Sequence, residues 1–445
     1  MSFNITLVSL GCSKNLVDSE VMLNILASNE YKLTKDLENA DIIIVNTCGF
    51  IESAKQESID NIIELGQLKE NGKCKVLIAA GCLAERYKEE LINEMPELDA
   101  VIGTGDYKNI LEVIDSAMQG NKVVRFGNQE NVDIYDLPRV ISTTASSTYL
   151  KIAEGCDNRC TYCIIPKLRG RYRSRRFEDI VSEAKLLVKQ GIKEFNIIAQ
   201  DTSRYGKDLY GEYKIAELLQ EISNIEGIKW IRLLYSYPDE FDDKLINVIA
   251  DNDKICNYLD IPIQHASNRI LKRMGRRTTK EEILELIKKL RNRIPDITLR
   301  TTLIVGFPGE SEEDFKELVD FVKEVQFDRL GVFTYSREED TPAYEMEDQI
   351  DEEIKLKRQE RIMLLQSDIS YDKNQRIQGK TFEVLVEGTE HKKYYGRSSK
   401  DAPEIDGTVF FTSKDMLKPG DFTYVKITEA SEYDLMGEEI NEYSK

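Results

Sequence analysis

Cys156, Cys160 and Cys163 lie in one stretch of eight residues with the spacing C-x3-C-x2-C. A tight loop with this spacing can direct three thiolates at one four-iron cluster and leave one iron without a protein ligand. An open iron indicates a cluster that binds a substrate, whereas clusters that only carry electrons usually have four thiolates. A zinc site or buried free thiols are the alternatives, but zinc requires a fourth ligand and the neighbouring sequence offers none.

The chain has 445 residues, which is long enough for two or three domains. The strands and helices of these domains must position the Cys156 loop. Eight cysteines and only two histidines favour thiolate ligands over a histidine-rich metal site. We find no apolar run of membrane-spanning length and no basic region before the first apolar stretch, and therefore expect a cytoplasmic protein without a membrane partner. The net charge of −19 favours basic partners over phosphate backbones.

Residues 1–126 alternate apolar runs with amphipathic stretches, which predicts a doubly wound α/β domain. The expected parallel strands are residues 5–10, 41–46, 75–80 and 100–102, and the expected helices are 17–27, 53–68 and 85–94.

Cys12, Cys48 and Cys82 each follow one of the first three expected strands, and a glycine lies beside each of them. The carboxyl ends of parallel strands meet at one edge of a sheet, where such domains bind ligands. Glycine allows the backbone to approach an inorganic ligand closely. A packing role is the alternative for any one cysteine, but three at corresponding positions predict a second three-thiolate cluster. Cys74 and Cys256 lack such a setting, and we expect them to be structural.

Residues 127–147 lose periodicity and gain small and polar residues, which predicts a linker. Residues 148–377 resume the alternation with six strands, too few to close an eight-stranded barrel, and predict an open, partial (β/α)6 barrel. The Cys156 loop follows the first of these strands, on the carboxyl face where barrel active sites lie. The expected strands are 149–153, 194–199, 230–234, 258–263, 298–305 and 329–333, and the expected helices are 177–190, 213–225, 240–251, 279–293, 311–325 and 351–375.

Two local patterns support the ends of these elements. Thr279 with Glu282 and Ser311 with Asp314 are candidate capping boxes at helix starts. Residues 378–445 contain short β-type segments separated by turns, which predicts a small antiparallel β-barrel.

Polar and glycine residues follow three strands of the predicted partial barrel. Gly306 and Gly309 join the fifth strand to a helix, where free N–H groups could face a carboxylate or ribose. Gln200 and Asp201 follow the second strand, and Gln264 follows the fourth. A structural role is the alternative for each of these five residues.

The stretch from Lys167 to Arg176 places six cations in ten residues just after the Cys156 loop. Arginine presents paired donors to carboxylates and phosphates, so this run could bind an anion near the cluster. The alternative is a solvated basic loop paired with acidic neighbours.

The C-x3-C-x2-C run, with an aromatic residue before its last thiol, resembles the signature of the radical S-adenosylmethionine enzymes. With its two cysteine trios, doubly wound domain, partial barrel and β-barrel tail, the whole chain resembles the methylthiotransferases. The resemblance implies a radical [4Fe-4S] cluster on Cys156, Cys160 and Cys163, and an auxiliary [4Fe-4S] cluster on Cys12, Cys48 and Cys82. It further implies a TRAM-like tail and contacts to S-adenosylmethionine from Gln200, Asp201, Gln264, Gly306 and Gly309.

The reaction that the resemblance implies replaces a C–H bond with C–SCH3. The radical cluster cleaves S-adenosylmethionine, the deoxyadenosyl radical removes a hydrogen from the substrate, and sulfur at the auxiliary cluster is transferred with a methyl group from a second S-adenosylmethionine. An external donor such as flavodoxin or ferredoxin supplies the electrons. No acid–base residue is assigned.

One branch of this family modifies adenosine in transfer RNA, and the other modifies the β-carbon of an aspartate in the small-subunit ribosomal protein S-twelve. The segments 164–175, 396–398 and 401–407 resemble the ribosomal-protein branch. Residues 379–445 contain 14 acidic and 9 basic residues, which suits a basic protein better than RNA. A transfer-RNA methylthiotransferase is the nearest alternative, and a non-catalytic iron–sulfur factor that docks on the ribosome is the alternative of another class.

Overall fold

The structure is a computed structural model that describes residues 3–129, 138–143 and 146–440. Residues 130–137 and 144–145 of the predicted linker, and the terminal residues 1–2 and 441–445, lie outside the described residues. The chain forms two compact units. The first comprises Met1–Ser142, Lys151–Asp179 and Ser336–Tyr344, and the second comprises Thr143–Leu150, Ile180–Tyr335 and Glu345–Lys445. The predicted domain limits at residues 126, 147 and 377 stay a prediction.

The first unit contains a parallel sheet of six strands in the order β2-β1-β3-β4-β5-β6. Every residue of β3 and β4 is buried, as expected for aliphatic strands covered on both faces. The strands are β1 (Asn4–Ser9), β2 (Lys32–Leu33), β3 (Ile42–Thr47), β4 (Val76–Gly81), β5 (Ala100–Ile102) and β6 (Val123–Arg125).

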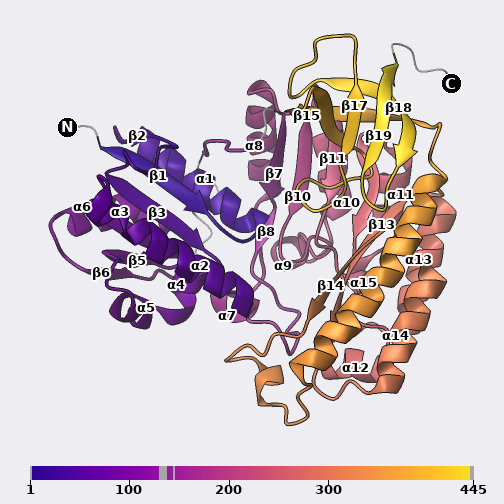
Figure 1. Ribbon diagram of the computed structural model, residues 1–445, viewed down its shortest axis with the longest axis horizontal. Coiled ribbons are helices and arrows are strands. Elements are labelled where there is room, and N and C mark those ends of the chain that lie inside the picture. The colour runs from indigo at the N-terminus through magenta and orange to yellow at the C-terminus, as the bar shows by residue number, and fades with distance from the viewer. Residues whose placement is uncertain (1–2, 130–137, 144–145, 441–445) are drawn as a thin grey trace. The chain divides into compact units, whose positions relative to one another are not determined.

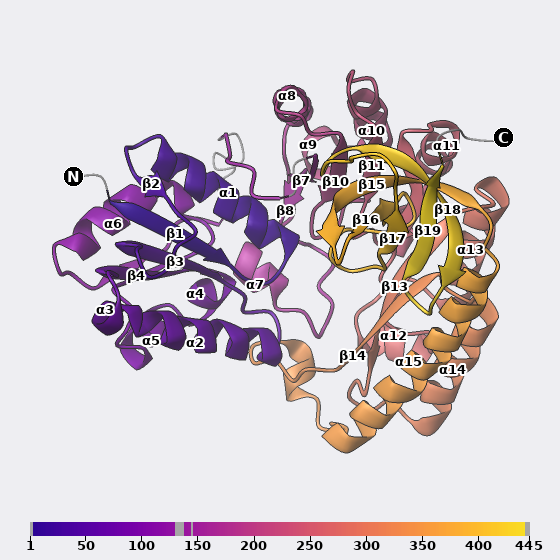
Figure 2. The ribbon, with the colours of Figure 1, turned by 45° about the horizontal axis from the view of Figure 1, so that its top comes forward.

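Helices cover both faces of this sheet (Figure 2). Helices α1 and α6 pack on one face, in a core that includes Ile44 and Ile78, whereas α2, α4 and α5 pack on the other, in a core that includes Ile43 and Leu77. The predicted doubly wound domain is therefore confirmed. The helices are α1 (Ser13–Ala27), α2 (Glu52–Gly66), α3 (Leu68–Asn71), α4 (Cys82–Tyr87), α5 (Glu89–Glu94) and α6 (Ile110–Met118).

Two details of this unit differ from the sequence prediction. The single helix expected at residues 85–94 is wrong, because Lys88 has φ +51° and separates α4 from α5. Strands β2 and β6 were not predicted, because two or three residues are too few for a strand pattern to be recognised.

The second unit contains an open six-stranded sheet in the order β14-β13-β12-β11-β10-β7 (Figure 1), which confirms the partial barrel. The strands are β7 (Ser147–Lys151), β10 (Glu194–Ile198), β11 (Trp230–Leu233), β12 (Ile255–Asp260), β13 (Thr298–Val305) and β14 (Arg329–Thr334). The helices between and after them are α8 (Phe177–Lys189), α9 (Lys207–Tyr210), α10 (Ile215–Ser223), α11 (Asp243–Asp251), α12 (Asn268–Arg273), α13 (Lys280–Arg293), α14 (Glu312–Val325) and α15 (Glu352–Gln375).

Both predicted capping boxes are present. The Thr279 side chain accepts from the backbone of Glu282 at the start of α13, and the Ser311 side chain accepts from that of Asp314 at the start of α14. Within the described ranges, no helix combines the length and the apolar character that crossing a membrane requires.

The carboxyl-terminal strands close into a barrel in the order β15-β16-β17-β19-β18. Four neighbouring pairs are antiparallel as predicted, while β17 and β19 run parallel. A core of aliphatic and aromatic side chains, including Val384 and Phe411, fills the barrel. The strands are β15 (Thr381–Glu390), β16 (Lys393–Ser398), β17 (Val409–Thr412), β18 (Phe422–Ala430) and β19 (Leu435–Ile440).

Candidate cluster and cofactor sites

Cys48 and Cys82 lie directly after β3 and β4, and Cys12 follows β1 after two intervening residues. These three strands are neighbours in the first sheet. The register aligns Ser9 with Asn46 in the first pair of these strands, and Thr47 with Gly81 in the second pair. The three strands therefore end at the same level, and the three cysteine loops meet at one edge of the sheet, as the sequence predicted.

Glycines permit the close approach of these loops to one another. A Cβ atom on Gly11, which has φ +84°, would lie 2.8 Å from Cβ of Cys48. A Cβ atom on Gly49 would lie 2.9 Å from the carbonyl carbon of Cys82. Any side chain at either position would push two cysteine loops apart, so these glycines are required for the convergence of the loops.

Asn15, in the first turn of α1, connects all three loops. Its Nδ2 donates to the carbonyl oxygens of Leu10 at 3.1 Å and of Thr47 at 2.9 Å. Its Oδ1 accepts from Sγ of Cys82 at 3.7 Å. Asn15 is fully buried, and its amide therefore links Leu10, two residues before Cys12, and Thr47, directly before Cys48, to Cys82.

The three thiols differ in exposure. Cys12 is exposed, whereas Cys48 and Cys82 are buried. Burial raises the pKa of Cys48 to about 11 and that of Cys82 to about 12, and the neighbouring Arg169 opposes the rise in both. Cys12 also raises the pKa of both other thiols.

The Cys156 loop is closed at its base by two short antiparallel strands, β8 (Ala153–Glu154) and β9 (Arg173–Ser174). The backbone N–H of Cys156 donates to the carbonyl of Gly170 at 3.2 Å, and that of Cys163 donates to Cys160 at 3.1 Å. Helix α7 (Ile165–Arg169) begins two residues after Cys163, with a proline in its first turn.

The three thiols of this loop are half-buried. Burial raises the pKa of Cys163 well above its usual range, and Cys160 and Cys156 raise it further. Both cysteine trios belong to the first compact unit, where Cys82 packs against Ile164 and Leu168.

The donor atoms in both trios fit a [4Fe-4S] cluster. No three Cys, His, Asp or Glu side chains within the described ranges could share a single metal ion. Each thiolate of a four-iron cluster binds its own iron, so the sulfur atoms need only surround the cluster rather than converge on one point. Three thiols per trio leave one iron for another ligand. Cys74 and Cys256 are buried. Cys74 belongs to a hydrophobic core of the first unit and donates to the carbonyl of Val76 at 3.5 Å.

Gln264 lies after β12, in the second unit, with a left-handed backbone at φ +70°. Its backbone is fixed by hydrogen bonds to Thr302 and Ile304 of β13. The buried Oε1 atom of its side chain has no hydrogen-bond partner among the described residues. A strained, orphaned amide at a strand end fits a ligand contact, because buried polar groups are normally paired.

Gly306 and Gly309 lie in the predicted turn after β13, with φ +71° and +80°. Their amides are not free: Gly306 N–H donates to Oε2 of Glu310 at 2.7 Å, and Gly309 N–H donates to the carbonyl of Asp348 at 2.7 Å. These two N–H groups are therefore used within the turn, and the contact of Gly306 and Gly309 with a cofactor stays a prediction. The Glu310 side chain stabilises this turn, and Nη1 of Arg358 in α15 donates to Oε1 of Glu310 at 2.8 Å.

Gln200 and Asp201 follow β10 in the second unit. Asp201 is buried and accepts a 2.6 Å hydrogen bond from Ser203. Gln200, Asp201 and Gln264 thus all follow strands of the open sheet, as predicted, and their contact with a cofactor stays a prediction.

The six cations of the basic run divide into three groups. Arg173 is half-buried and donates to the carbonyl of Arg169 at 3.1 Å. Arg169 and Arg175 are buried. The exposed cations pair with acidic side chains: Lys167 lies 3.0 Å from Asp340, Arg171 lies 3.8 Å from Asp157, and Arg176 lies 3.4 Å from Asp179. The interpretation as a solvated, paired loop fits these three cations, and Arg169 has a different role.

Sequence reasoning missed Asn15 and Glu310. A polar residue in the first turn of a helix that begins at a candidate ligand could have pointed to Asn15. His265, which follows Gln264 directly in the sequence, is fully buried: its Nδ1 accepts from Ser267 N–H at 3.0 Å, and its Nε2 lies 3.6 Å from Glu310.

Models of three families match the chain. The Radical SAM superfamily matches residues 150–322, the uncharacterized protein family UPF0004 matches residues 4–103, and the TRAM domain matches residues 379–440. Together with the cysteine trios and the open sheet, these matches define a radical S-adenosylmethionine enzyme with a TRAM domain.

Curated relatives make this class more specific. The chain is 57% identical to the ribosomal protein uS12 methylthiotransferase RimO of Clostridioides difficile, over 98% of this chain and 99% of that protein. It is 54% identical to the RimO protein of Acetivibrio thermocellus over the full length of both chains. The chain belongs to the RimO family of ribosomal protein uS12 methylthiotransferases.

Solved structures share the fold at low sequence identity. The radical S-adenosylmethionine methyltransferase TsrM from Kitasatospora setae superposes with a TM-score of 0.55 at 16% identity, covering 77% of each chain. The cobalamin-dependent radical enzyme OxsB superposes with a TM-score of 0.51 at 14% identity, covering 77% of this chain and 55% of OxsB.

Proposed function

We propose that this enzyme adds a methylthio group to the β-carbon of an aspartate in ribosomal protein uS12. The observation that carries the proposal is the presence of two three-thiol sets in one compact unit, in a chain that matches uS12 methylthiotransferases over its full length. When bound, two [4Fe-4S] clusters and S-adenosylmethionine supply the radical and sulfur chemistry, and the protein supplies position and exclusion of water.

The residues that hold these groups follow from the site. Cys156, Cys160 and Cys163 would bind the radical cluster. The auxiliary cluster would be bound by Cys12, Cys48 and Cys82. Because Cys12 is exposed while its two partners are buried, the auxiliary site opens to the outside of the first unit at Cys12.

Gln264 is the best supported of the candidate S-adenosylmethionine contacts. Its buried Oε1 would gain the hydrogen-bond donor that it lacks when the cofactor binds. Gln264→Leu should weaken S-adenosylmethionine binding about tenfold or more, because the site then loses a hydrogen bond to a charged cofactor. Isothermal titration with the anaerobic, cluster-loaded protein measures this change, and Gln378→Leu, an exposed glutamine, is the control.

The choice of substrate rests on charge and on the relatives. An enzyme with a net charge of −19 attracts a basic ribosomal protein and repels an RNA backbone. We further propose that the enzyme works in the cytoplasm with an external electron donor such as flavodoxin or ferredoxin.

Parallel incubations test the substrate. The loaded enzyme, reductant and S-adenosylmethionine are mixed either with uS12 or with transfer RNA, and mass spectrometry detects the added methylthio group. Modification of the aspartate in uS12 is expected. Modification of RNA alone would favour a transfer-RNA methylthiotransferase, and failure to form 5′-deoxyadenosine in either mixture would favour a non-catalytic factor.

A further inference from the structure

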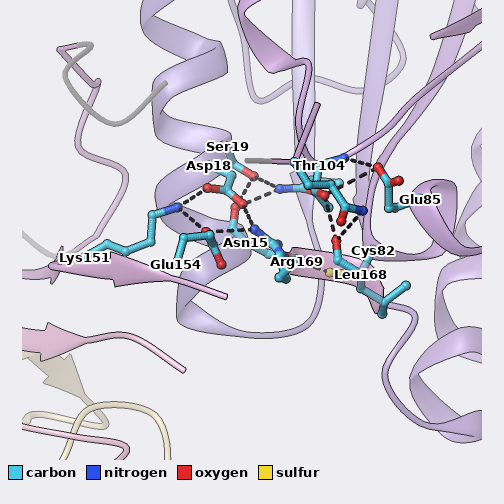
Figure 3. A network of polar contacts seen from close by, with 12 residues as sticks. Asn15, Asp18, Ser19, Cys82, Glu85, Thr104, Lys151, Glu154, Leu168 and Arg169 are labelled. Atoms are coloured by element: carbon cyan, nitrogen blue, oxygen red, sulfur yellow. Dashed lines mark hydrogen bonds and ion pairs between the residues drawn. The ribbon is translucent and has the colours of Figure 1, made fainter. Parts of the chain in front are cut away.

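Arg169 lies at the centre of a buried polar network in the first unit (Figure 3). Its side chain is 3% exposed. Nε donates to Sγ of Cys82 at 3.3 Å, Nη1 donates to Oδ2 of Asp18 at 2.6 Å, and Nη2 donates to Oδ1 of Asn15. The guanidinium therefore directs one of its donors at a sulfur atom and uses the others to fix its own orientation.

The charges around Arg169 are balanced. Glu154 lies 3.3 Å from Nη1 of Arg169, and Lys151 lies 2.5 Å from Asp18 and 3.0 Å from Glu154. All four ionic side chains are almost completely buried, so two cations compensate two anions. A buried charge without a partner is strongly destabilising. The guanidinium of Arg169 is therefore held in place by its ion pairs with Asp18 and Glu154.

The same arginine belongs to the segment that carries the radical-cluster cysteines. Arg169 ends α7, which begins just after Cys163, and the next residue, Gly170, accepts the backbone hydrogen bond from Cys156. The carbonyl of Leu168 accepts from Thr104 at 2.8 Å, which ties α7 to the loop after β5. The backbone around Arg169 is thus linked to Cys156 by a hydrogen bond and to Cys163 through α7. The side chain of Arg169 contacts Cys82, which belongs to the other trio.

We propose that Arg169 is a positioning residue that donates to the sulfur of Cys82 in the auxiliary cluster and raises the reduction potential of that cluster. The inference rests on the proposed function, which assigns Cys82 to the auxiliary cluster. Hydrogen bonds to ligand sulfur atoms and nearby positive charge stabilise the reduced, more negative state of an iron–sulfur cluster. Because Arg169 belongs to α7, the reduction potential of the auxiliary cluster depends on α7 being folded against Cys82.

The test uses full-length protein in which Cys156, Cys160 and Cys163 are all replaced by Ala, so that only the auxiliary cluster assembles. Its potential is measured by redox titration with electron paramagnetic resonance, before and after Arg169→Gln. Loss of a hydrogen bond to a charged group should lower the ratio of reduced to oxidised cluster about tenfold at a fixed potential, which is about 59 mV for one electron.

Controls separate this role from a general effect on folding. Arg175→Gln removes a buried cation from the same run, one that donates to the carbonyl of Lys151 rather than to a thiol, and should leave the potential unchanged. Arg169→Gln combined with Asp18→Asn restores charge balance and should keep the lowered potential, with iron content close to that of the parent.

The outcomes are distinct. An unchanged potential in both Arg169 variants, with full iron content, overturns the inference and leaves the proposed function intact. Failure of the three-alanine parent to bind iron overturns the two-cluster assignment and the inference with it. An equal shift in the Arg175→Gln control also overturns the inference, because the effect would then not be specific to the contact with Cys82.

Discussion

Nη2 of Arg397, in the carboxyl-terminal barrel, donates a 2.7 Å hydrogen bond to Oε2 of Glu194 in β10 of the open sheet, and both side chains are buried. Arg232 lies 3.3 Å from the other oxygen of Glu194. Arg397 comes from a segment, 396–398, whose sequence resembles the ribosomal-protein branch. In the structure, Arg397 attaches the TRAM barrel to the sheet.

Removing this ion pair should weaken the attachment. Arg397→Ala leaves Glu194 buried without its main partner, which typically costs about 3–5 kcal/mol. Trp230 is the chain's single tryptophan and packs edge-on against Phe422 of the TRAM barrel, so its fluorescence in a denaturant titration reports on this interface. Lys426→Ala, an exposed cation of the same barrel, should leave the transition unchanged. A variant of Arg397 as stable as the wild type would contradict the prediction.

Glu194 also makes the stability of the second unit depend on pH. Burial alone would raise the pKa of Glu194, but Arg397 and Arg232 outweigh it and lower the pKa from 4.5 to about 2. Because the folded state lowers this pKa, the stabilisation is complete above pH 4.5 and is lost as the pH falls towards 2. The difference in unfolding free energy between wild type and Glu194→Gln should therefore shrink across this range. A difference that stays constant with pH would exclude this role for Glu194.

Gly11 should be essential for the auxiliary site. Gly11→Ala places a Cβ atom 2.8 Å from Cβ of Cys48 at a backbone φ of +84°, which displaces the Cys48 loop. We expect at least a several-fold loss of auxiliary-cluster iron after anaerobic reconstitution. Gly120→Ala is a matched control, since Gly120 has φ +85° but no atom within 4 Å of the position that a Cβ would occupy, so it imposes the same backbone strain without the collision.

Substitutions in the two cysteine trios should differ in the products that the enzyme forms, and each should lower its iron content. Wild-type protein should bind about eight irons after reconstitution, as expected for two four-iron clusters, and Cys12→Ala should bind about four. Cys12→Ala should still cleave S-adenosylmethionine to 5′-deoxyadenosine but should form no methylthio product, whereas Cys156→Ala should form neither. Cys74→Ala should bind the full amount of iron, and a loss of half its iron would show that the ligand assignment is wrong.

The capping box of α13 offers a test of local stability. Thr279→Ala removes the hydroxyl that accepts from the Glu282 N–H, and loss of such a cap typically costs about 1 kcal/mol. Thermal unfolding followed by circular dichroism should show a small decrease in the midpoint. Thr389→Ala, in strand β15 with no capping role, should have a smaller effect, and equal effects of the two substitutions would argue against a specific contribution of the cap.

The sequence by itself determined the fold class and the six cysteine positions. Strand periodicity, the alternation with helices and the place of each cysteine after a strand are local patterns, and the register of a parallel sheet converts equal positions along strands into one shared edge. The glycines beside Cys12 and Cys48 were visible for the same reason, although only the structure shows that each approaches another cysteine loop.

Only the tertiary structure decided the roles of Arg169, Arg397 and the Gly306 turn. Six cations in ten residues look alike in sequence, yet Arg169 is buried against Cys82 while Lys167 is exposed beside Asp340. Likewise, the amide of Gly306 is occupied by Glu310. Which partner a long polar side chain or a backbone N–H finds depends on residues distant in the chain, because burial and charge compensation are properties of the packed fold.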